Sequence, residues 1–319
     1  MQAEKAPVPF AYTDDNKRYH TLAYDNRRRF GRRMQKAVVD AGFACPHSEK
    51  GGCTFCAEGS GAVAAGGLPV AEQIRREGER IHRKYPQAGI VVYFQAHTNT
   101  FAPLERLRAL YDPVAAMPEV AGISIATRPD CLPPETVDYL AELAAKTALT
   151  VELGLQTMRD DTAKRIHRGY DTACFVQAFA ALKKREIRVC VHLINGLPGE
   201  EAADMVQSAR LLGNLRPDGV KLHLLHILSG TAMAEEWAAG KVPVMERDAY
   251  TAVICSQLEV LPPETVIERL TGDGPRDRLL APVWSRNKIA VLAGIDKELV
   301  RRNTWQGKDW GKDGAADCL

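Results

Sequence analysis

The stretch "GIVVYFQAHTNTFAPLERLRALYDPVAAM", residues 89–117, contains the pattern on which most of the chain is built. It opens with a short, β-branched apolar run at 89–95 and continues into a window at 104–117 whose apolar side chains recur with helical spacing. A short run that is apolar at consecutive positions is typical of a strand buried on both faces of a parallel sheet. The stretch therefore predicts one strand followed by one helix.

The same unit recurs along the first two thirds of the chain. Similar strand-like runs lie at 36–41, 122–127, 149–155, 189–194 and 220–225, and helical patterns fill the intervals at 70–84, 134–145, 172–184 and 200–215. Most of the runs follow one another at about thirty residues, as strand–helix units do. Six such units predict an α/β fold with a parallel sheet, either a full or partial barrel or a doubly wound sheet. In each of these folds ligands bind where strands end and loops begin.

The remainder of the chain departs from this rhythm. Helices are predicted at 232–239, 246–260 and 287–302, with one strand-like run at 265–272, and the last residues are polar and rich in Gly and Asp. Of the 319 residues, 45% are hydrophobic and 26% are charged, which excludes a disordered chain. Neither a secretory signal nor an apolar run long enough to cross a membrane is visible, so we expect a cytoplasmic protein with reduced thiols and no membrane partner.

Three cysteines lie close together directly after the first predicted strand. They are Cys45, Cys53 and Cys56 in "ACPHSEKGGCTFC", residues 44–56. Three free thiols on an exposed loop would be liable to oxidation, which disfavours coincidence. A zinc site would need a fourth ligand, for which His47 is available, and an iron–sulfur cluster on three thiolates would leave one iron open.

The surroundings of the cysteines favour the cluster over zinc. Zinc ribbons pair two CxxC knuckles, and the sequence holds only one. An open iron at the ligand-binding edge of a parallel sheet can hold the amino and carboxylate groups of S-adenosylmethionine and supply an electron to it. The sequence therefore predicts radical chemistry at this loop.

At this point the sequence resembles the radical SAM enzymes, and within them the YhcC/YtqA-type branch, which is related to the elongator catalytic subunit. The resemblance runs in order from about residue 20 to 308 and rests on nine segments, among them "GGCTFC" 51–56, "GISIATRPDCLP" 122–133, "VELGLQT" 151–157, "HLINGLPGE" 192–200 and "RLTGDGPRD" 269–277. It implies a partial (β/α)6 TIM-type barrel with a small, mainly helical C-terminal extension. The implied division is a basic N-terminal segment, the barrel, the extension and a flexible tail, at 1–35, 36–230, 231–305 and 306–319.

The resemblance also implies the cofactors and the residues that hold them. Cys45, Cys53 and Cys56 would bind a [4Fe–4S] cluster, and S-adenosylmethionine would bind beside it. The residues expected to contact the cofactor are Phe55, Gln95, Thr98, Asn99, Glu152, Gln156, Arg168 and Asn195. In relatives, Phe55 corresponds to an aromatic residue against the adenine, and Gln156 and Arg168 to a cofactor-binding pair.

Two further features bear on catalysis. Ala126 replaces an acidic residue of several relatives, and Glu152 could supply the missing carboxylate, although an ion pair with an arginine such as Arg128 would also explain a buried acid. "RLTGDGPRD" could be a turn with a surface ion pair, or a loop that closes over the site and orders the substrate. On the second interpretation Arg269 and Asp273 join Glu152 as candidate catalytic residues.

A basic stretch points to a partner. "RRRFGRRMQK", Arg27–Lys36, holds five arginines and no acid, which suits phosphates of RNA but also a solvated helix face. By analogy with the elongator, the substrate would be tRNA modified at a wobble uridine. A reductase or a flavodoxin-type protein would donate the electron. The alternatives are a radical SAM enzyme acting on a small molecule and, in another class, a non-catalytic zinc-bearing RNA-binding or scaffold protein.

Overall fold

The computed structural model describes residues 10–57, 66–272 and 274–312. The chain forms two compact units. The cysteine-loop unit comprises Asn26–His192 with Gly230–Ala232, and the C-terminal unit comprises Met1–Asp25, Leu193–Ser229 and Met233–Leu319. Each unit is described by itself.

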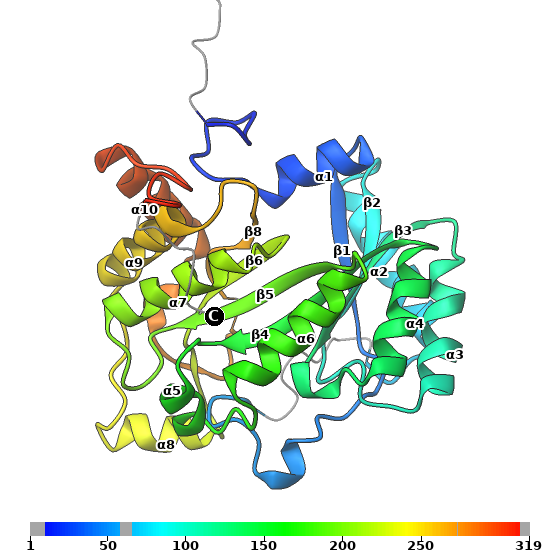
Figure 1. The fold of residues 1–319 in the computed structure, drawn as a ribbon, viewed down its shortest axis with the longest axis horizontal. Coiled ribbons are helices and arrows are strands. Elements are labelled where there is room, and N and C mark those ends of the chain that lie inside the picture. Colours follow the sequence, from blue (N-terminus) through cyan, green and yellow to red (C-terminus); the bar gives the residue numbers. More distant parts are fainter. Residues whose placement is uncertain (1–9, 58–65, 273, 313–319) are drawn as a thin grey trace, which may run out of the picture. The chain divides into compact units, whose positions relative to one another are not determined.

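The cysteine-loop unit is built from repeated strand–helix units (Figure 1). Its strands are β1 (Met34–Val39), β2 (Gly89–Phe94), β3 (Val120–Thr127), β4 (Ala148–Gln156) and the first part of β5 (Arg188–Asn195). Its long helices are α2 (Val70–Lys84), α3 (Leu104–Ala115), α4 (Pro134–Ala144) and α6 (Thr172–Lys184). The short helix α5 (Asp160–Arg165) follows β4, and α1 (Leu22–Phe30) precedes β1; neither was predicted as an element.

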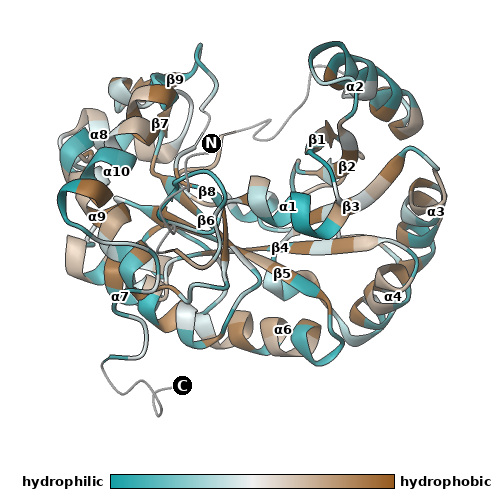
Figure 2. Cartoon of the chain, turned by 90° about the horizontal axis from the view of Figure 1, so that it is seen from above, coloured by the Kyte–Doolittle hydropathy of each residue, from teal (hydrophilic) through white to brown (hydrophobic). Residues whose placement is uncertain are grey.

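The strands pair in parallel, and their two faces differ. Met34 pairs with Gly89 at the start of β1 and β2, and Ala126 pairs with Glu152 near the ends of β3 and β4. Figure 2 shows the long helices on one face of these strands, which we call the outer face. The residues of that face are fully buried and apolar: Ala37, Val39, Val92, Phe94, Ile123, Ile125, Val151, Leu153, Val189 and Val191.

The alternate residues of the same strands form the inner face, which is more polar. Lys36, Ala126 and His192 are half-buried there, and only Glu152 among the charged inner residues is fully buried. The expectation that the strands are buried apolar runs on both faces is therefore wrong for the inner face. The strands alternate because the long helices α2, α3, α4 and α6 cover the outer face.

The C-terminal unit contains the remaining strands and helices. β6 (Gly219–Leu224) pairs in parallel with β8 (Val266–Arg269), and β7 (Ile227–Leu228) pairs antiparallel with β9 (Leu279–Ala281). The helices are α7 (Ala202–Asn214), α8 (Ala232–Ala238), α9 (Arg247–Val260) and α10 (Lys288–Arg301), and α9 packs against both α7 and α10.

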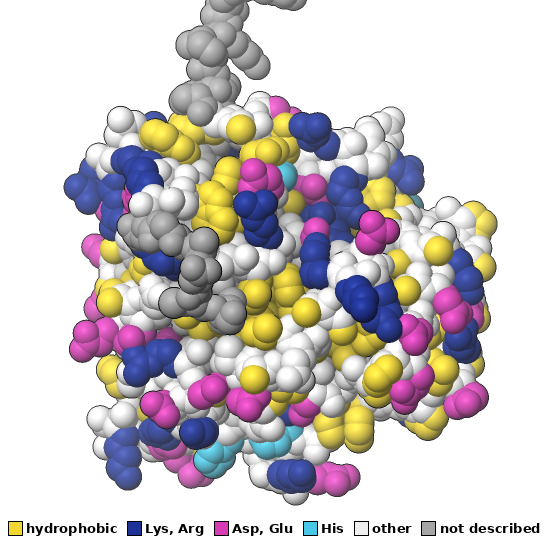
Figure 3. Space-filling view, viewed as in Figure 1, with side chains coloured by type: hydrophobic (Ala, Val, Ile, Leu, Met, Phe, Trp, Pro, Cys, Tyr) yellow, Lys and Arg dark blue, Asp and Glu magenta, His cyan; other side chains and the backbone are white. Residues whose placement is uncertain are grey.

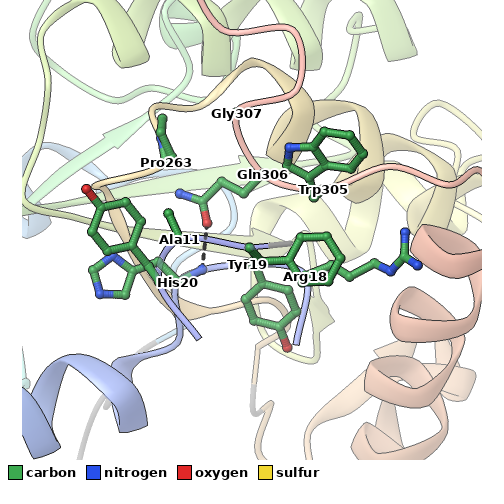
Figure 4. A pocket seen from close by; sticks show the side chains of 10 residues that line it. Ala11, Arg18, Tyr19, His20, Pro263, Trp305, Gln306 and Gly307 are labelled. Carbon is green, nitrogen blue, oxygen red and sulfur yellow. Dashed lines mark hydrogen bonds between the residues drawn. The ribbon is translucent and has the colours of Figure 1, made fainter. Parts of the chain in front are cut away.

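The N-terminal segment packs on this C-terminal unit (Figure 4). The backbone N–H of His20 donates to Oε1 of Gln306 (2.9 Å), and Nε2 of Gln306 donates to the carbonyls of Pro262 and Thr265. Trp305 and Pro263 lie beside them, around a cavity of about 220 Å³. Gln306 thus ties the beginning of the chain to the residues that lead into β8.

The strand order of the main sheet is β1-β2-β3-β4-β5-β6-β8. The predicted fold class, a partial (β/α)6 barrel with a mainly helical C-terminal extension, is confirmed. The strand-like run at 265–272 is also confirmed, but its place as a seventh strand beside β6 was not predicted. No helix of the described ranges is long and apolar enough to span a membrane.

Candidate radical SAM site

The cysteine loop leaves the carboxyl end of β1. Cys45 and Cys53 are half-buried and Cys56 is exposed, and all three are reduced thiols. Gly51 and Gly52 both adopt positive φ (89° and 67°), which an L side chain rarely tolerates, and they turn the chain back toward Cys53. The N–H of Cys56 donates to the carbonyl of Cys53 (3.0 Å), so a tight turn presents these two sulfurs with half-buried Phe55 between them.

The loop is docked on the segment between α5 and α6. Nε2 of His47 lies 2.6 Å from the carbonyl oxygen of His167, and the N–H of Thr54 donates to the carbonyl of Ile166 (3.0 Å). A Cβ on Gly169 would lie 2.7 Å from the His47 ring, so glycine is needed for this close approach. His47 therefore holds the loop in place, which weakens its case as a fourth zinc ligand.

The three thiols are close enough to affect one another electrostatically. The pKa of Cys53 is raised to about 12, chiefly by burial and also by Cys56 and Cys45, while Arg128 and Arg168 oppose the rise. Three thiolates would repel one another here unless a bound cation balanced them. Within the described ranges no group of three or more metal-binding side chains is already arranged around a point.

Arg168 organises the carboxyl end of β4. Its guanidinium is buried, with Nη1 donating to the carbonyls of Leu155 (2.6 Å) and Thr157 (2.8 Å) and Nε to that of Tyr170 (2.9 Å). Burial lowers the pKa of Arg168. These bonds give Arg168 a positioning role, and its direct contact with a cofactor stays a prediction.

Gln156, the last residue of β4, has a strained backbone. Its φ is 64°, which is uncommon for a residue other than glycine. The hydroxyl of Tyr170 lies within hydrogen-bond distance of the carbonyl of Gly154 (2.7 Å) and of Oε1 of Gln156 (3.2 Å), and its one proton can be donated to either. A Cβ on Gly154 would lie 2.6 Å from Nε2 of Gln156, so this glycine makes room for the folded-back amide. Such strain at a strand end is typical of functional sites.

The segment after β2 contains the other predicted cofactor contacts. Gln95 is half-buried, and Thr98 and Asn99 are buried. Nδ2 of Asn99 lies within hydrogen-bond distance of the carbonyls of Phe94, Ala96 and Ala126. Its Oδ1 is buried and has no partner among the described residues. An unpaired buried acceptor at a ligand-binding edge fits an ammonium donor.

Glu152 lies on the inner face, directly beside Ala126 in the register. Its Oε1 accepts from Nζ of Lys36 (2.7 Å) and its Oε2 from Nε2 of His192 (2.8 Å). The alternative of an ion pair between Glu152 and Arg128 is wrong, because Arg128 pairs with Asp130 through two bonds (2.9 and 2.8 Å). The carboxylate does stand beside the position of the missing acidic residue, as the sequence suggested.

Lys36 and His192 were missed as partners of Glu152. Lys36 was assigned to the basic stretch, and His192 was not expected beside Glu152. Lys36 Nζ also lies 4.6 Å from the ring centroid of Tyr93, so β1, β2, β4 and β5 each contribute to this group. The alternation of Lys36 with buried Ala37 could have revealed that Lys36 faces inward.

In the C-terminal unit, the predicted residues have other partners. The side-chain amides of Asn195 and Gln257 bond each other reciprocally (2.9 and 2.8 Å), and both are buried. The loop after β8 packs on His226, since a Cβ on Gly272 or Gly274 would approach its ring to 3.0 or 2.8 Å. Arg269 is half-buried at the end of β8, and Asp273 lies outside the described residues.

The basic stretch Arg27–Lys36 does not form one surface. Arg27, Arg28 and Arg29 are exposed on α1, whereas Lys36 turns to the inner face. Arg32 and Arg33 lie between them at the start of β1. On the face drawn in Figure 3, basic and acidic side chains are interspersed.

Comparison with known proteins agrees with the fold and the cysteine loop. The model of the radical SAM superfamily matches residues 42–212, more than half of the chain, and that of the Radical_SAM C-terminal domain matches residues 217–301. The chain therefore belongs to the radical SAM superfamily and is an enzyme of that class. It is not the non-catalytic zinc-bearing protein that the sequence left open.

Within the superfamily, the chain is similar to the uncharacterized protein YtqA of Bacillus subtilis, with 46% identity over 306 residues, 94% of this chain and 95% of YtqA. It is also similar to a tRNA uridine(34) acetyltransferase of Dehalococcoides mccartyi, with 28% identity over 48% of this chain and 34% of that protein. The solved archaeal Elp3 of Methanocaldococcus infernus shares the fold, with a TM-score of 0.64 and 17% identity over 90% of this chain and 70% of Elp3. The predicted branch, related to the elongator subunit, is confirmed.

Proposed function

We propose that Cys45, Cys53 and Cys56 hold a [4Fe–4S] cluster and that S-adenosylmethionine binds beside it at the carboxyl ends of β1–β4. The observation that carries the proposal is the loop itself, which holds three reduced thiols on one docked segment in a chain of the radical SAM superfamily. When bound, the cluster would supply the electron that cleaves S-adenosylmethionine and yields a radical able to abstract hydrogen.

The chain's own residues would bind and orient the cofactor. Oδ1 of Asn99 offers an acceptor for the ammonium group, and Gln95 and Thr98 flank it on the same segment. Gln156, which is fixed by Tyr170, and Arg168 would face the carboxylate end. Phe55 would contact the adenine. In the C-terminal unit, Asn195 stays a candidate cofactor contact through its backbone, since its side chain is bonded to Gln257.

Glu152 would work through its two partners. Its carboxylate is fully buried, while the side chains of Lys36 and His192 are 25% and 20% exposed. The carboxylate therefore fixes two groups that reach the inner face, one of them always a donor and the other able to move a proton. We propose that this trio orients the substrate, with Arg269 and Asp273 of the C-terminal unit as further catalytic candidates.

We propose tRNA as the substrate, modified at a wobble uridine. Support comes from the similarity to the tRNA uridine(34) acetyltransferase of Dehalococcoides mccartyi and from the fold shared with Elp3, and a small-molecule substrate is the second candidate. The proposed electron donor is a reductase or a flavodoxin-type protein. Comparing modified nucleosides in tRNA from cells with and without this protein tests the substrate: an unchanged tRNA profile favours the small molecule.

The cluster is tested by Cys53→Ala, with Cys174→Ala as the matched control because Cys174 is a half-exposed thiol outside the loop. Anaerobically reconstituted wild type and control should hold about four irons per chain and produce deoxyadenosine with dithionite. Cys53→Ala should lose both, with unchanged far-UV circular dichroism. Retained deoxyadenosine production in Cys53→Ala would contradict the assignment.

A further inference from the structure

A cationic pocket lies at the opposite end of β1 from the cysteine loop. It is a cavity of about 860 Å³ lined by Gly31–Arg33 and by residues 84–88, which precede β1 and β2 respectively. Its lining contains three cations, Arg32, Arg33 and Lys84, and no acidic residue. We infer that this pocket binds a backbone phosphate of an RNA. This inference rests on the proposed tRNA substrate and names a binding site for it.

Local geometry brings the three cations together. The guanidinium carbon of Arg33 lies 3.8 Å from the ring centroid of Tyr85, and Nζ of Lys84 lies 5.3 Å from it. A Cβ on Gly89 would lie 2.6 Å from the Met34 side chain and 2.9 Å from Nε of Arg32, so Arg32 lies close to the start of β2. Basic groups from two separate segments thus lie beside Tyr85 and Gly89.

The charges of these groups are not balanced locally. Arg32, Arg33 and Lys84 form no ion pair with any residue that the structure describes. On the neighbouring helix α2, by contrast, Arg75, Arg76 and Arg80 each pair with a glutamate of the same helix. Three convergent cations without acids repel one another, and an anion relieves that repulsion.

The pocket chemistry favours phosphate over a nucleobase. Arginine forks match phosphate oxygens, and lysine adds a further point charge. The one aromatic ring, Tyr85, already has Arg33 stacked 3.8 Å from its centroid, so that face is not open to a base. The pocket would therefore contact the RNA without reading its sequence.

The position of the pocket indicates the size of the ligand. β1 has six residues, Met34–Val39, which span about 20 Å at the rise of a strand. A single nucleotide cannot reach from the pocket to the cysteine loop at the other end of β1. A folded RNA can place a target base at one end and a backbone phosphate at the other.

The test is a triple variant, Arg32→Gln/Arg33→Gln/Lys84→Gln, measured for tRNA binding against salt concentration. The matched control, Arg75→Gln/Arg76→Gln/Arg80→Gln, removes the same charge from α2. Loss of three phosphate contacts should reduce the slope of log affinity against log salt by about 2 and weaken binding at low salt at least about tenfold. The control should keep the wild-type slope, and thermal unfolding of both variants shows whether either has lost its fold.

The outcomes separate the pocket from the proposed substrate. If wild type binds tRNA and both variants keep its slope, the pocket assignment is overturned while tRNA stands as substrate. If wild type cleaves S-adenosylmethionine but does not bind tRNA, both the substrate and this site are overturned. A reduced slope in the pocket variant alone supports the assignment.

Discussion

The two faces of strands β1–β5 in the cysteine-loop unit are made by alternate residues of the same short segments, yet they serve different ends. The outer face is apolar and fully buried under helices, with Leu153 and Val151 as examples. The inner face, one residue away, carries Glu152 with Lys36 and His192. Successive residues of a strand point to opposite faces. In these strands one set of alternate residues therefore packs the core, and the other set carries the candidate catalytic groups.

The largest effect on stability is expected on the outer face. Leu153→Ala should lower the free energy of unfolding by about 2–5 kcal/mol, because it deletes buried methyl groups and leaves a cavity. Chemical denaturation measures it. At a temperature where the variant stays folded, its affinity for S-adenosylmethionine should be unchanged. A loss of affinity in the folded variant would contradict the assignment of the outer face to stability alone.

On the inner face, Glu152→Gln should cost about 1–3 kcal/mol of stability while it impairs turnover more strongly than cofactor binding. The variant removes the negative partner of Lys36, whose partial exposure limits the cost. Lys36→Met/Glu152→Gln should recover part of the lost stability, which a double-mutant cycle measures. If the stability losses of Lys36→Met and Glu152→Gln simply add up in the double variant, Lys36 and Glu152 are not coupled.

At the end of β4, Gln156→Gly is expected to change stability by less than about 1 kcal/mol. Relief of the positive φ offsets the lost bond from Tyr170. Affinity for S-adenosylmethionine should fall at least about tenfold, measured by calorimetry on reconstituted protein. Unchanged affinity would reduce Gln156 to a structural turn residue.

The smallest effect is expected on the surface, at Glu298 of α10. Hydrogen bonds from Arg301 and Arg302 lower the pKa of Glu298 to about 2. Because the folded pKa lies below the unfolded value, the stabilisation is present above about pH 4.3 and is lost as the pH falls toward 2. Solvent screening limits it to a few tenths of a kcal/mol. Glu298→Gln should reduce the acid dependence of unfolding, and an identical pH profile would contradict the pairing.

The periodic parts of the fold could be predicted from the sequence. The run at 89–95 and the window at 70–84 differ from β2 and α2 by a residue at most. The polar inner face was missed because the apolar residues of these short strands mask the alternation of Lys36, Glu152 and His192. Short α5 carries too few apolar residues for a helical period to show.

Contacts between distant segments were the hardest to predict. The spacing of the cysteines indicated a shared ligand, but it does not show that His47 bonds the carbonyl of His167. Asn195 was placed by its motif, whereas its partner Gln257 lies on a helix 62 residues further along the chain. Contacts between residues so far apart in the sequence are formed by tertiary packing, and local sequence patterns do not predict them.

The side-chain amide of Asn99 has two roles, one for its nitrogen and one for its oxygen. Its nitrogen ties the ends of β2 and β3 together, and its oxygen faces no protein donor among the described residues. A truncation at this position would loosen the corner and remove the acceptor at once, so an affinity measured on that variant mixes both losses. A cofactor analogue without its amino group, offered to the unaltered protein, would isolate what the oxygen alone contributes.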